Sequence, residues 1–247
     1  MTWYLKSLAC CCLVAASYNA FAQNTNVSEY YYSGYRIDYS EVDRLINEVR
    51  GGKKSDVAIN AQKQFQIGLT FEYGKGVQVD YKEAFFWYKK SAELDNPSAQ
   101  FALARMFEEG KGVAKDLKQA ANWYEKSADQ GALEAQYNLA LMYALGEGVK
   151  QDLTKAYAWY EKAAQAGYVK AQHNLALQLA KGEGVTVDFV RAHMWLTLAM
   201  TLDKSQENSQ KSLLLLESHM SPEQMEQSKM MVKAWLALQP PNIVSAK

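Results

Sequence analysis

The chain has 247 residues, and 49% of them are apolar, which is enough for one sizeable domain with its own hydrophobic core. Its 27 basic and 27 acidic residues cancel and are interspersed, so the charge pattern gives no support to nucleic-acid binding. The apolar content also excludes a wholly disordered chain.

Residues 1–22 have the pattern of a secretory signal peptide. Lys6 is the one cation of a short n-region, residues 7–16 are mostly apolar, and Ala20-Phe21-Ala22 is a small-x-small motif. The apolar run is shorter than the roughly 20 residues that span a bilayer. We expect cleavage after Ala22 and a periplasmic or secreted product, with an uncleaved anchor as the alternative.

All three cysteines lie inside this first segment, at Cys10, Cys11 and Cys12. A lipoprotein is therefore a second alternative, although the residues before Cys10 and Cys11 do not complete a lipobox. The mature chain has no cysteine and must hold together by packing, without disulfides. Loss of Lys6 leaves 26 basic and 27 acidic residues, and no later apolar run approaches membrane-spanning length, so we expect no membrane insertion after cleavage.

Residues 23–60 are expected to form a tyrosine-rich arm and an N-terminal capping helix. Five tyrosines crowd the arm between positions 30 and 39. They form either a recognition surface, since tyrosine combines apolar area with a polar tip, or a cover over the first end of the fold. Helical spacing from Ser40 to Arg50 predicts the capping helix, with Gly51-Gly52 at its end.

Residues 61–203 contain four copies of one unit, each 36 residues after the last. The landmark is Gly-x-Gly-Val, preceded by a glutamine and followed by an aspartate, an alanine and a tryptophan at fixed offsets. A strict repeat of this length is typical of a solenoid whose units bury apolar faces against one another. We therefore predict an all-α fold of four 36-residue helix pairs. The four loops begin at Gly74, Gly110, Gly146 and Gly182.

The first helix of each pair is predicted at 59–73, 98–109, 133–145 and 169–181. The first glycine of the loop ends it, because glycine takes the left-handed conformation without a Cβ clash. A small residue in each of these helices would let the two helices of a unit approach closely. The valine of the loop is expected to pack onto the core. The small residues are Gly68, Ala104, Ala140 and Ala176.

An aspartate is predicted to cap the N-terminus of each second helix. In the first two copies Glu83 and Gln119 also fit the reciprocal pattern of a capping box. Gly131 and Gly167 are expected to end two of these helices, and Asp95-Asn96 ends the first. The capping aspartates are Asp80, Asp116, Asp152 and Asp188.

Residues 204–247 are predicted to be C-terminal capping helices. One helix is expected near residues 206–218, and a second starts at Ser221-Pro222 with Gln224 three positions on. Pro240-Pro241 ends it. Solenoids need end caps with a polar outer face, and this tail is expected to supply one.

The unit resembles the Sel-one-like repeat family. Ala-x-x-x-Leu-Ala-x-x-Tyr precedes the loop, and Asp-x-x-x-Ala-x-x-Trp-Tyr-x-Lys-Ala-Ala follows it, most completely in the third copy from Ala135 to Ala164. Tetratricopeptide repeats are related, but their 34-residue period fits less well. The resemblance covers about 61–203 and implies a right-handed α/α superhelix that acts as a scaffold or adaptor. Exported β-lactamase-like members carry a cysteine pair in each repeat, which this chain lacks.

No residues have the spacing of a catalytic, metal or cofactor site. The loops lack the order of a phosphate-binding P-loop, and no His/Asp/Glu set has metal-ligand spacing. The repeated tryptophans are interpreted as core, His173 as a substitute for an aromatic residue, and Glu108 and Glu109 as solvated.

One face of the first helices remains for partner binding. In α/α solenoids these helices line the concave side, and residues at i, i+3 and i+4 share one helix face. Its amides and methionines suit a peptide, with Asn138 and Asn174 bonded to the peptide backbone. The alternative is that Leu141, Met142 and Leu177 pack against neighbouring helices. The predicted partner-binding residues are Gln66, Leu69, Thr70, Arg105, Met106, Asn138, Leu141, Met142, Asn174, Leu177 and Gln178.

The first functional hypothesis is therefore a monomeric, non-catalytic periplasmic adaptor that holds a protein or peptide in its concave groove. The second is a peptidoglycan-binding or β-lactamase-like cell-wall protein. A third, a regulatory subunit of an envelope machine, differs from the first only in its partner.

Overall fold

The computed structural model describes residues 39–51, 57–203, 205 and 207–238, and all secondary structure in these ranges is helical. The predicted all-α fold is confirmed, and the bounds predicted for the first helices agree to within two residues. The predicted signal peptide and the tyrosines at 30–35 lie outside the described residues. The helices are α3 (Tyr39–Gly51), α4 (Val57–Tyr73), α5 (Tyr81–Ala92), α6 (Pro97–Glu109), α7 (Leu117–Asp129), α8 (Leu133–Leu145), α9 (Leu153–Gln165), α10 (Val169–Lys181), α11 (Phe189–Leu202), α12 (Glu207–Glu217) and α13 (Pro222–Leu238).

The predicted aspartate caps are present on all four second helices, α5, α7, α9 and α11. Each carboxylate accepts hydrogen bonds from main-chain N–H groups of the first turn, which have no partner inside the helix. In the predicted capping boxes, the side chains of Glu83 and Gln119 would accept a hydrogen bond from the N–H of the capping aspartate. In the structure a main-chain oxygen accepts it instead. The N–H of Asp80 donates to the main-chain oxygen of Phe71 at 3.0 Å, and the other three aspartates bond in the same way to the residue nine positions earlier.

Both glycines of each loop have positive φ angles, from 65° to 75°. The first glycine caps the preceding helix in the left-handed conformation, as predicted. The second allows a close contact between repeats. A Cβ atom on Gly148 would lie 2.1 Å from the main-chain oxygen of Leu117, at the start of α7 in the preceding repeat. Gly112 and Gly184 lie equally close to the second helices before them.

The repeated glutamines join each repeat to the next. The Nε2 atoms of Gln100, Gln136 and Gln172 donate to main-chain oxygens in the last turn of α5, α7 and α9, at 3.3, 3.1 and 3.2 Å. Each of these carbonyl groups also accepts a hydrogen bond from a main-chain N–H just past the end of its helix, so the glutamine supplies a second bond, one that comes from the next repeat. The sequence spacing of 36 residues therefore repeats a contact as well as a motif.

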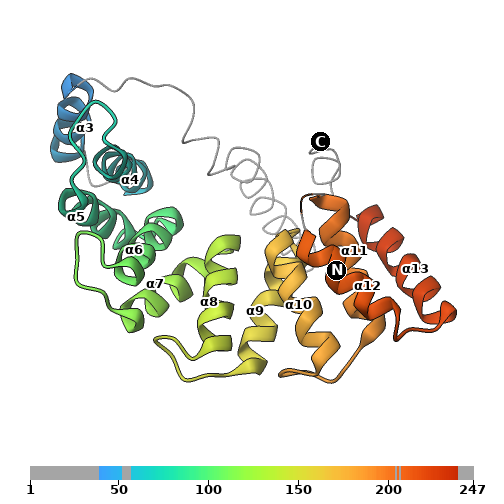
Figure 1. The fold of residues 1–247 in the computed structure, drawn as a ribbon. Coiled ribbons are helices and arrows are strands. Elements are labelled where there is room, and N and C mark those ends of the chain that lie inside the picture. The colour runs from blue at the N-terminus through green and yellow to red at the C-terminus, as the bar shows by residue number, and fades with distance from the viewer. Residues whose placement is uncertain (1–38, 52–56, 204, 206, 239–247) are drawn as a thin grey trace, which may run out of the picture.

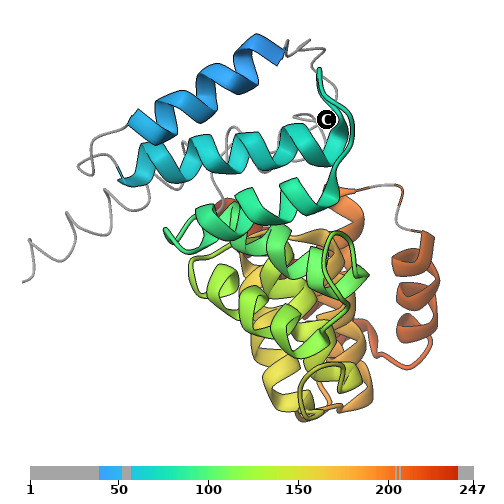
Figure 2. The same cartoon turned by 90° about the vertical axis from the view of Figure 1, so that its left-hand side faces the viewer.

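The helices follow an arc with α4, α6, α8 and α10 on its inner side (Figure 1). Each packs against the second helix of its own repeat, and α6, α8 and α10 also pack against the second helix of the repeat before them. Fully buried alanines and tyrosines fill these contacts, as expected for faces that meet closely. At the first end, α3 lies along α4, which confirms the predicted capping helix (Figure 2).

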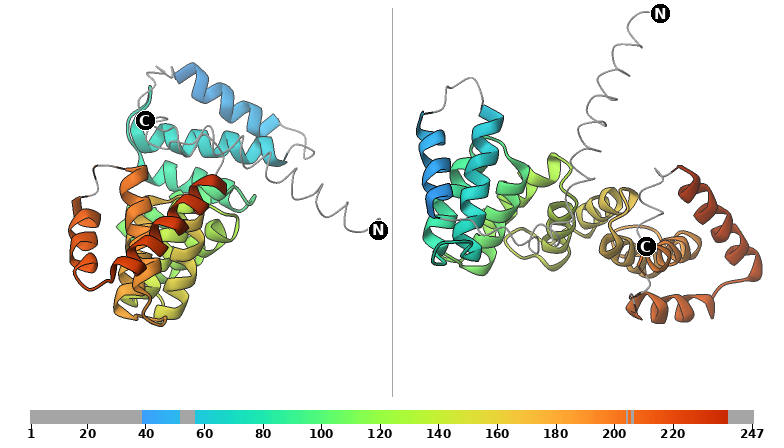
Figure 3. Two further views of the ribbon diagram at one scale, coloured as in Figure 1. Left: turned by 90° about the vertical axis from the view of Figure 1, so that its right-hand side faces the viewer. Right: turned by 90° about the horizontal axis from the view of Figure 1, so that it is seen from above.

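At the last end, α12 and α13 both pack on α11 (Figure 3). A reciprocal capping box starts α13, in which Ser221 and Gln224 exchange hydrogen bonds of 2.9 and 3.3 Å. We predicted that the outer side of the C-terminal helices is polar, but exposed apolar side chains lie on α12. Leu214 and Leu215 on α12 are 62% and 68% exposed, since α12 turns only part of its apolar surface, including Leu216, toward the core.

Candidate binding face and its polar network

Seven of the predicted partner-binding residues are at least partly exposed, and they lie on the helices at the inner side of the arc. They lie on four successive first helices, so together they form a continuous face rather than one local site. Gln66 is exposed, and the other six are half-buried: Leu69, Arg105, Asn138, Leu141, Asn174 and Leu177.

The other four predicted residues do not belong to this face. Thr70, Met106, Met142 and Gln178 are between 1% and 4% exposed. They occupy one repeat position, four residues after Gln66 and its equivalents, and this position is turned toward the second helices. Met142, for example, belongs to the buried cluster around Tyr124. The packing alternative is therefore confirmed for Met142, and a bound chain would not reach these four side chains.

Sequence reasoning missed the residues seven positions after Gln66 and its equivalents. This spacing continues the same helix face by one turn, which is the signal that could have identified them. All four are exposed. They are Tyr73, Glu109, Leu145 and Lys181. We define the inner face as these four residues together with the seven named above.

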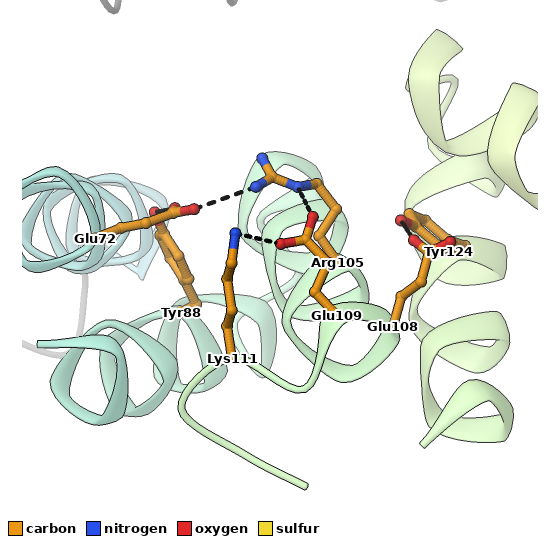
Figure 4. A network of polar contacts seen from close by, with 7 residues as sticks. All are labelled: Glu72, Tyr88, Arg105, Glu108, Glu109, Lys111 and Tyr124. Atoms are coloured by element: carbon orange, nitrogen blue, oxygen red, sulfur yellow. Dashed lines mark hydrogen bonds and ion pairs between the residues drawn. The ribbon is translucent and has the colours of Figure 1, made fainter. Parts of the chain in front are cut away.

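A polar network crosses the inner face at the first two repeats (Figure 4). The hydroxyl of buried Tyr88 donates to Glu72 at 2.5 Å, and the guanidinium of Arg105 on α6 lies 3.3 Å from the same carboxylate. Burial disfavours the charged form of Arg105, but Glu72, Tyr73 and Glu109 outweigh it, so the pKa of Arg105 is raised. Arg105 therefore stays charged and bonds the second repeat to the first.

Glu109 extends the network to the loop. Its carboxylate lies 3.4 Å from Arg105 and 2.6 Å from Lys111. Partial burial would raise its pKa, but the hydrogen bond from Lys111 and the charge of Arg105 lower it overall. Glu109 is therefore ionised at neutral pH and already has two cationic partners.

Glu108 makes a different contact. Its carboxylate accepts a hydrogen bond of 2.5 Å from the hydroxyl of Tyr124, whose ring is buried. Burial and this carboxylate raise the pKa of Tyr124 well above its usual range. Glu109 is exposed, as predicted, although Arg105 and Lys111 pair with it. The prediction that Glu108 is solvated was incomplete, because α7 of the same repeat brings the hydroxyl of Tyr124 to its carboxylate.

The two asparagines of the inner face have partners within the protein. Asn174 donates from Nδ2 to the hydroxyl of Tyr160 at 3.1 Å, and Asn138 lies in the same relation to Tyr124. Each asparagine thus lies beside the tyrosine of the preceding repeat. Only part of each amide is left for a bound chain.

Two histidines fix the C-terminal helices. His173 on α10 lies 2.9 Å from the hydroxyl of Ser209 on α12, and His193 on α11 lies 2.8 Å from that of Ser228 on α13. The other ring nitrogen of His193 is 3.2 Å from Glu217. Ser228, His193 and Glu217 resemble a hydrolytic triad in composition, but Ser228 is 0% exposed, so no substrate could reach its hydroxyl.

The repeated tryptophans pack as predicted. Trp87 and Trp195 are buried, and Trp123 and Trp159 pack against the core clusters beside them. Lys126 and Lys162 lie over the outer faces of the half-buried pair, at 4.0 and 3.8 Å from the ring centres. Protein groups therefore occupy both faces of these rings.

The described residues contain no group of three His, Cys, Asp or Glu side chains placed to hold a metal ion. Among them there is also no helix whose length and apolar character would let it cross a membrane. These observations leave the inner face as the candidate site.

Comparison with known proteins agrees with the repeat pattern. The family model described as Sel1 repeat matches residues 64–96, 97–131, 133–168 and 169–203, which together make up more than half of the chain. Sel1 repeats are typically scaffolds for protein interaction. A search of curated proteins returned no match.

Two solved structures share the fold. A Sel1 repeat protein from Oxalobacter formigenes is 33% identical with a TM-score of 0.64, over 75% of this chain and 52% of its own. A protective antigen of uropathogenic Escherichia coli strains, which displays an SLR fold, is 26% identical with a TM-score of 0.51, over 83% of this chain and 50% of its own. The chain thus spans about half the length of either relative. On its four matched repeats and the solenoid they build, the chain belongs to the Sel1 repeat family.

Proposed function

We propose that this protein is an exported, non-catalytic scaffold that binds a segment of another protein along its inner face. The observation that carries this proposal is the exposure of apolar side chains on the first helices. Leu69, Leu141 and Leu177 are half-buried and Leu145 is exposed. They lie on α4, α8 and α10, three of the four helices on the inner side of the arc, and Arg105 takes the equivalent place on α6. Apolar groups lined up across several elements and interrupted by polar ones are typical of peptide-binding grooves.

Export is the second part of the proposal, and it rests on the sequence of residues 1–22. The short n-region, the apolar run and the motif ending at Ala22 support secretion into the periplasm. The absence of cysteine after Cys12 suits an oxidising compartment, because no thiol is left to oxidise. We infer that the mature protein begins at Gln23 and meets its partner outside the cytoplasm.

The experiment purifies the protein from a periplasmic fraction, reads its N-terminal residue, and identifies envelope proteins that cross-link to it. Affinity for the partner found in this way is then measured with Leu145→Glu. A charge at Leu145, the last residue of α8, should weaken binding at least about tenfold, because an apolar contact is replaced by a group that needs water. Circular dichroism should show unchanged melting, since Leu145 is exposed.

Leu215→Glu is the matched control, because Leu215 is also an exposed leucine but lies on α12, away from the inner face. It should leave the affinity unchanged. If Leu215→Glu abolishes binding and Leu145→Glu does not, the partner binds the outer side of the last helices and the proposed face is wrong.

A further inference from the structure

The buried tyrosines of the second helices differ in one respect along the chain. In the first repeat the hydroxyl of Tyr88 donates to Glu72, and in the second that of Tyr124 donates to Glu108. In both pairs the glutamate precedes the tyrosine by 16 positions in the sequence. In the third repeat the tyrosine is Tyr160, but the residue 16 positions before it is Ala144. The third repeat therefore keeps the hydroxyl donor and lacks the carboxylate.

Tyr160 is set up as a hydrogen-bond donor. Its side chain is 2% exposed, and its oxygen accepts a hydrogen bond from Nδ2 of Asn174. Burial raises the pKa of Tyr160 to about 12, so the hydroxyl keeps its proton at neutral pH. Among the described residues no group accepts that proton, and a buried donor without an acceptor costs free energy.

The place of the absent carboxylate opens to the inner face. Glu108, which holds this place in the second repeat, is only half-buried, and Ala144 is likewise partly exposed. By repeat equivalence Leu177 stands beside Ala144, as Arg105 stands beside Glu72. Two donors therefore lie near Ala144, Tyr160 of the third repeat and Asn174 of the fourth, and Leu177 takes the place that Arg105 holds beside Glu72.

We propose that a carboxylate of the bound partner occupies this place and accepts hydrogen bonds from Tyr160 and Asn174. The partner is then an apolar segment that carries one aspartate or glutamate. Glu72 and Glu108 show that a carboxylate suits a tyrosine at this position, and both available groups are donors. This inference rests on the proposed function, because it specifies which chemistry the inner face selects.

The first test supplies the carboxylate from the protein itself. Ala144→Glu should recreate the pair of the first two repeats and raise the midpoint of thermal unfolding by about 2–4 °C. Adding Tyr160→Phe should remove this gain. Ala180→Glu is the matched control: it holds the same repeat position, but the residue 16 positions later is Leu196, which offers no hydroxyl. If Ala144→Glu gains nothing over Ala180→Glu, Asn174 already accepts the proton and the inference is wrong.

The second test uses a phage-displayed library of random 12-residue peptides selected on the purified protein. Enriched peptides should contain an acidic residue among apolar ones. A synthetic copy of an enriched peptide should bind at least about tenfold more weakly when its acidic residue is changed to the amide. The unchanged peptide should lose affinity to the same extent when it binds the Ala144→Glu protein.

The two proposals fail in different ways. Peptides that need Leu145 but no acidic residue, or that bind Ala144→Glu unchanged, contradict the carboxylate site and leave the inner face intact. Peptides that ignore Leu145→Glu, or a library that yields no binder, count against both.

Discussion

At the scale of single residues, the second glycine in the last three loops is tightly constrained. Gly148 has a φ angle of 71° and packs on the main chain of Leu117. A side chain there is strained by the backbone angle and also meets a main-chain oxygen, which cannot move aside by changing rotamer. The motif is therefore needed for stacking as well as for ending a helix.

We predict that Gly148→Ala lowers the free energy of unfolding by about 2–4 kcal/mol. Urea unfolding followed by circular dichroism measures it. Glu147→Ala, at the exposed residue before it, is the control and should change the midpoint little. Equal midpoints for Gly148→Ala and the wild type would show that the neighbouring repeat moves away without cost.

The neighbours Leu141 and Met142 show where sequence reasoning stops at this scale. Helical spacing predicts correctly that both lie toward one side of α8. It does not say which of them the next helix covers, because that depends on the angle at which two repeats pack. The contact between Tyr124 and Glu108, 16 residues apart on α7 and α6, depends likewise on the angle at which the two helices of one repeat pack. Helix starts such as Asp116 were predictable because caps are local.

At the scale of helices, α12 is held by a titratable group. Burial lowers the pKa of His173 below its ordinary value of 6.5, because the charged form is disfavoured. The unfolded chain therefore takes up its proton at a higher pH than the folded chain. The contribution of His173 to stability is constant above about pH 6.5 and is lost as the pH falls through the lowered pKa.

We predict that the midpoint of thermal unfolding falls between about pH 7.5 and pH 5.5, and falls less in His173→Phe/Ser209→Ala. Phenylalanine holds this position in the first two repeats, at Phe65 and Phe101. Ser209→Ala is added because the hydroxyl of Ser209 would lose its hydrogen-bond partner when His173 is replaced by phenylalanine. Ser209→Ala alone keeps the histidine and should keep the pH dependence. The same slope in the double variant and the wild type would assign the effect to other groups.

At the scale of the molecule, the helices pack mainly on neighbours in sequence. In such an array, stability is close to a sum of repeat and nearest-neighbour terms. A local defect should therefore stay local, and different parts of the chain should open with different free energies.

We predict that Glu72→Ala speeds amide hydrogen exchange in α4, α5 and α6 but not in α10 and α11. The change removes the carboxylate that binds both Tyr88 and Arg105, at a cost of about 1–3 kcal/mol. Exchange is measured by mass spectrometry, with Glu183→Ala, a change at a partly exposed carboxylate, as a control for charge. Equal acceleration in all helices would show that the array unfolds as one unit.

The contact of the second glycine with the preceding repeat, made in the last three loops, has a mechanical consequence. Gly112, Gly148 and Gly184 each touch main-chain atoms, which have no alternative rotamers, along the loop side of the array. Elsewhere the repeats meet through side chains, which can rearrange. The loop side is therefore the stiff margin of the molecule, and any flexing that widens or narrows the arc must be absorbed along the opposite margin.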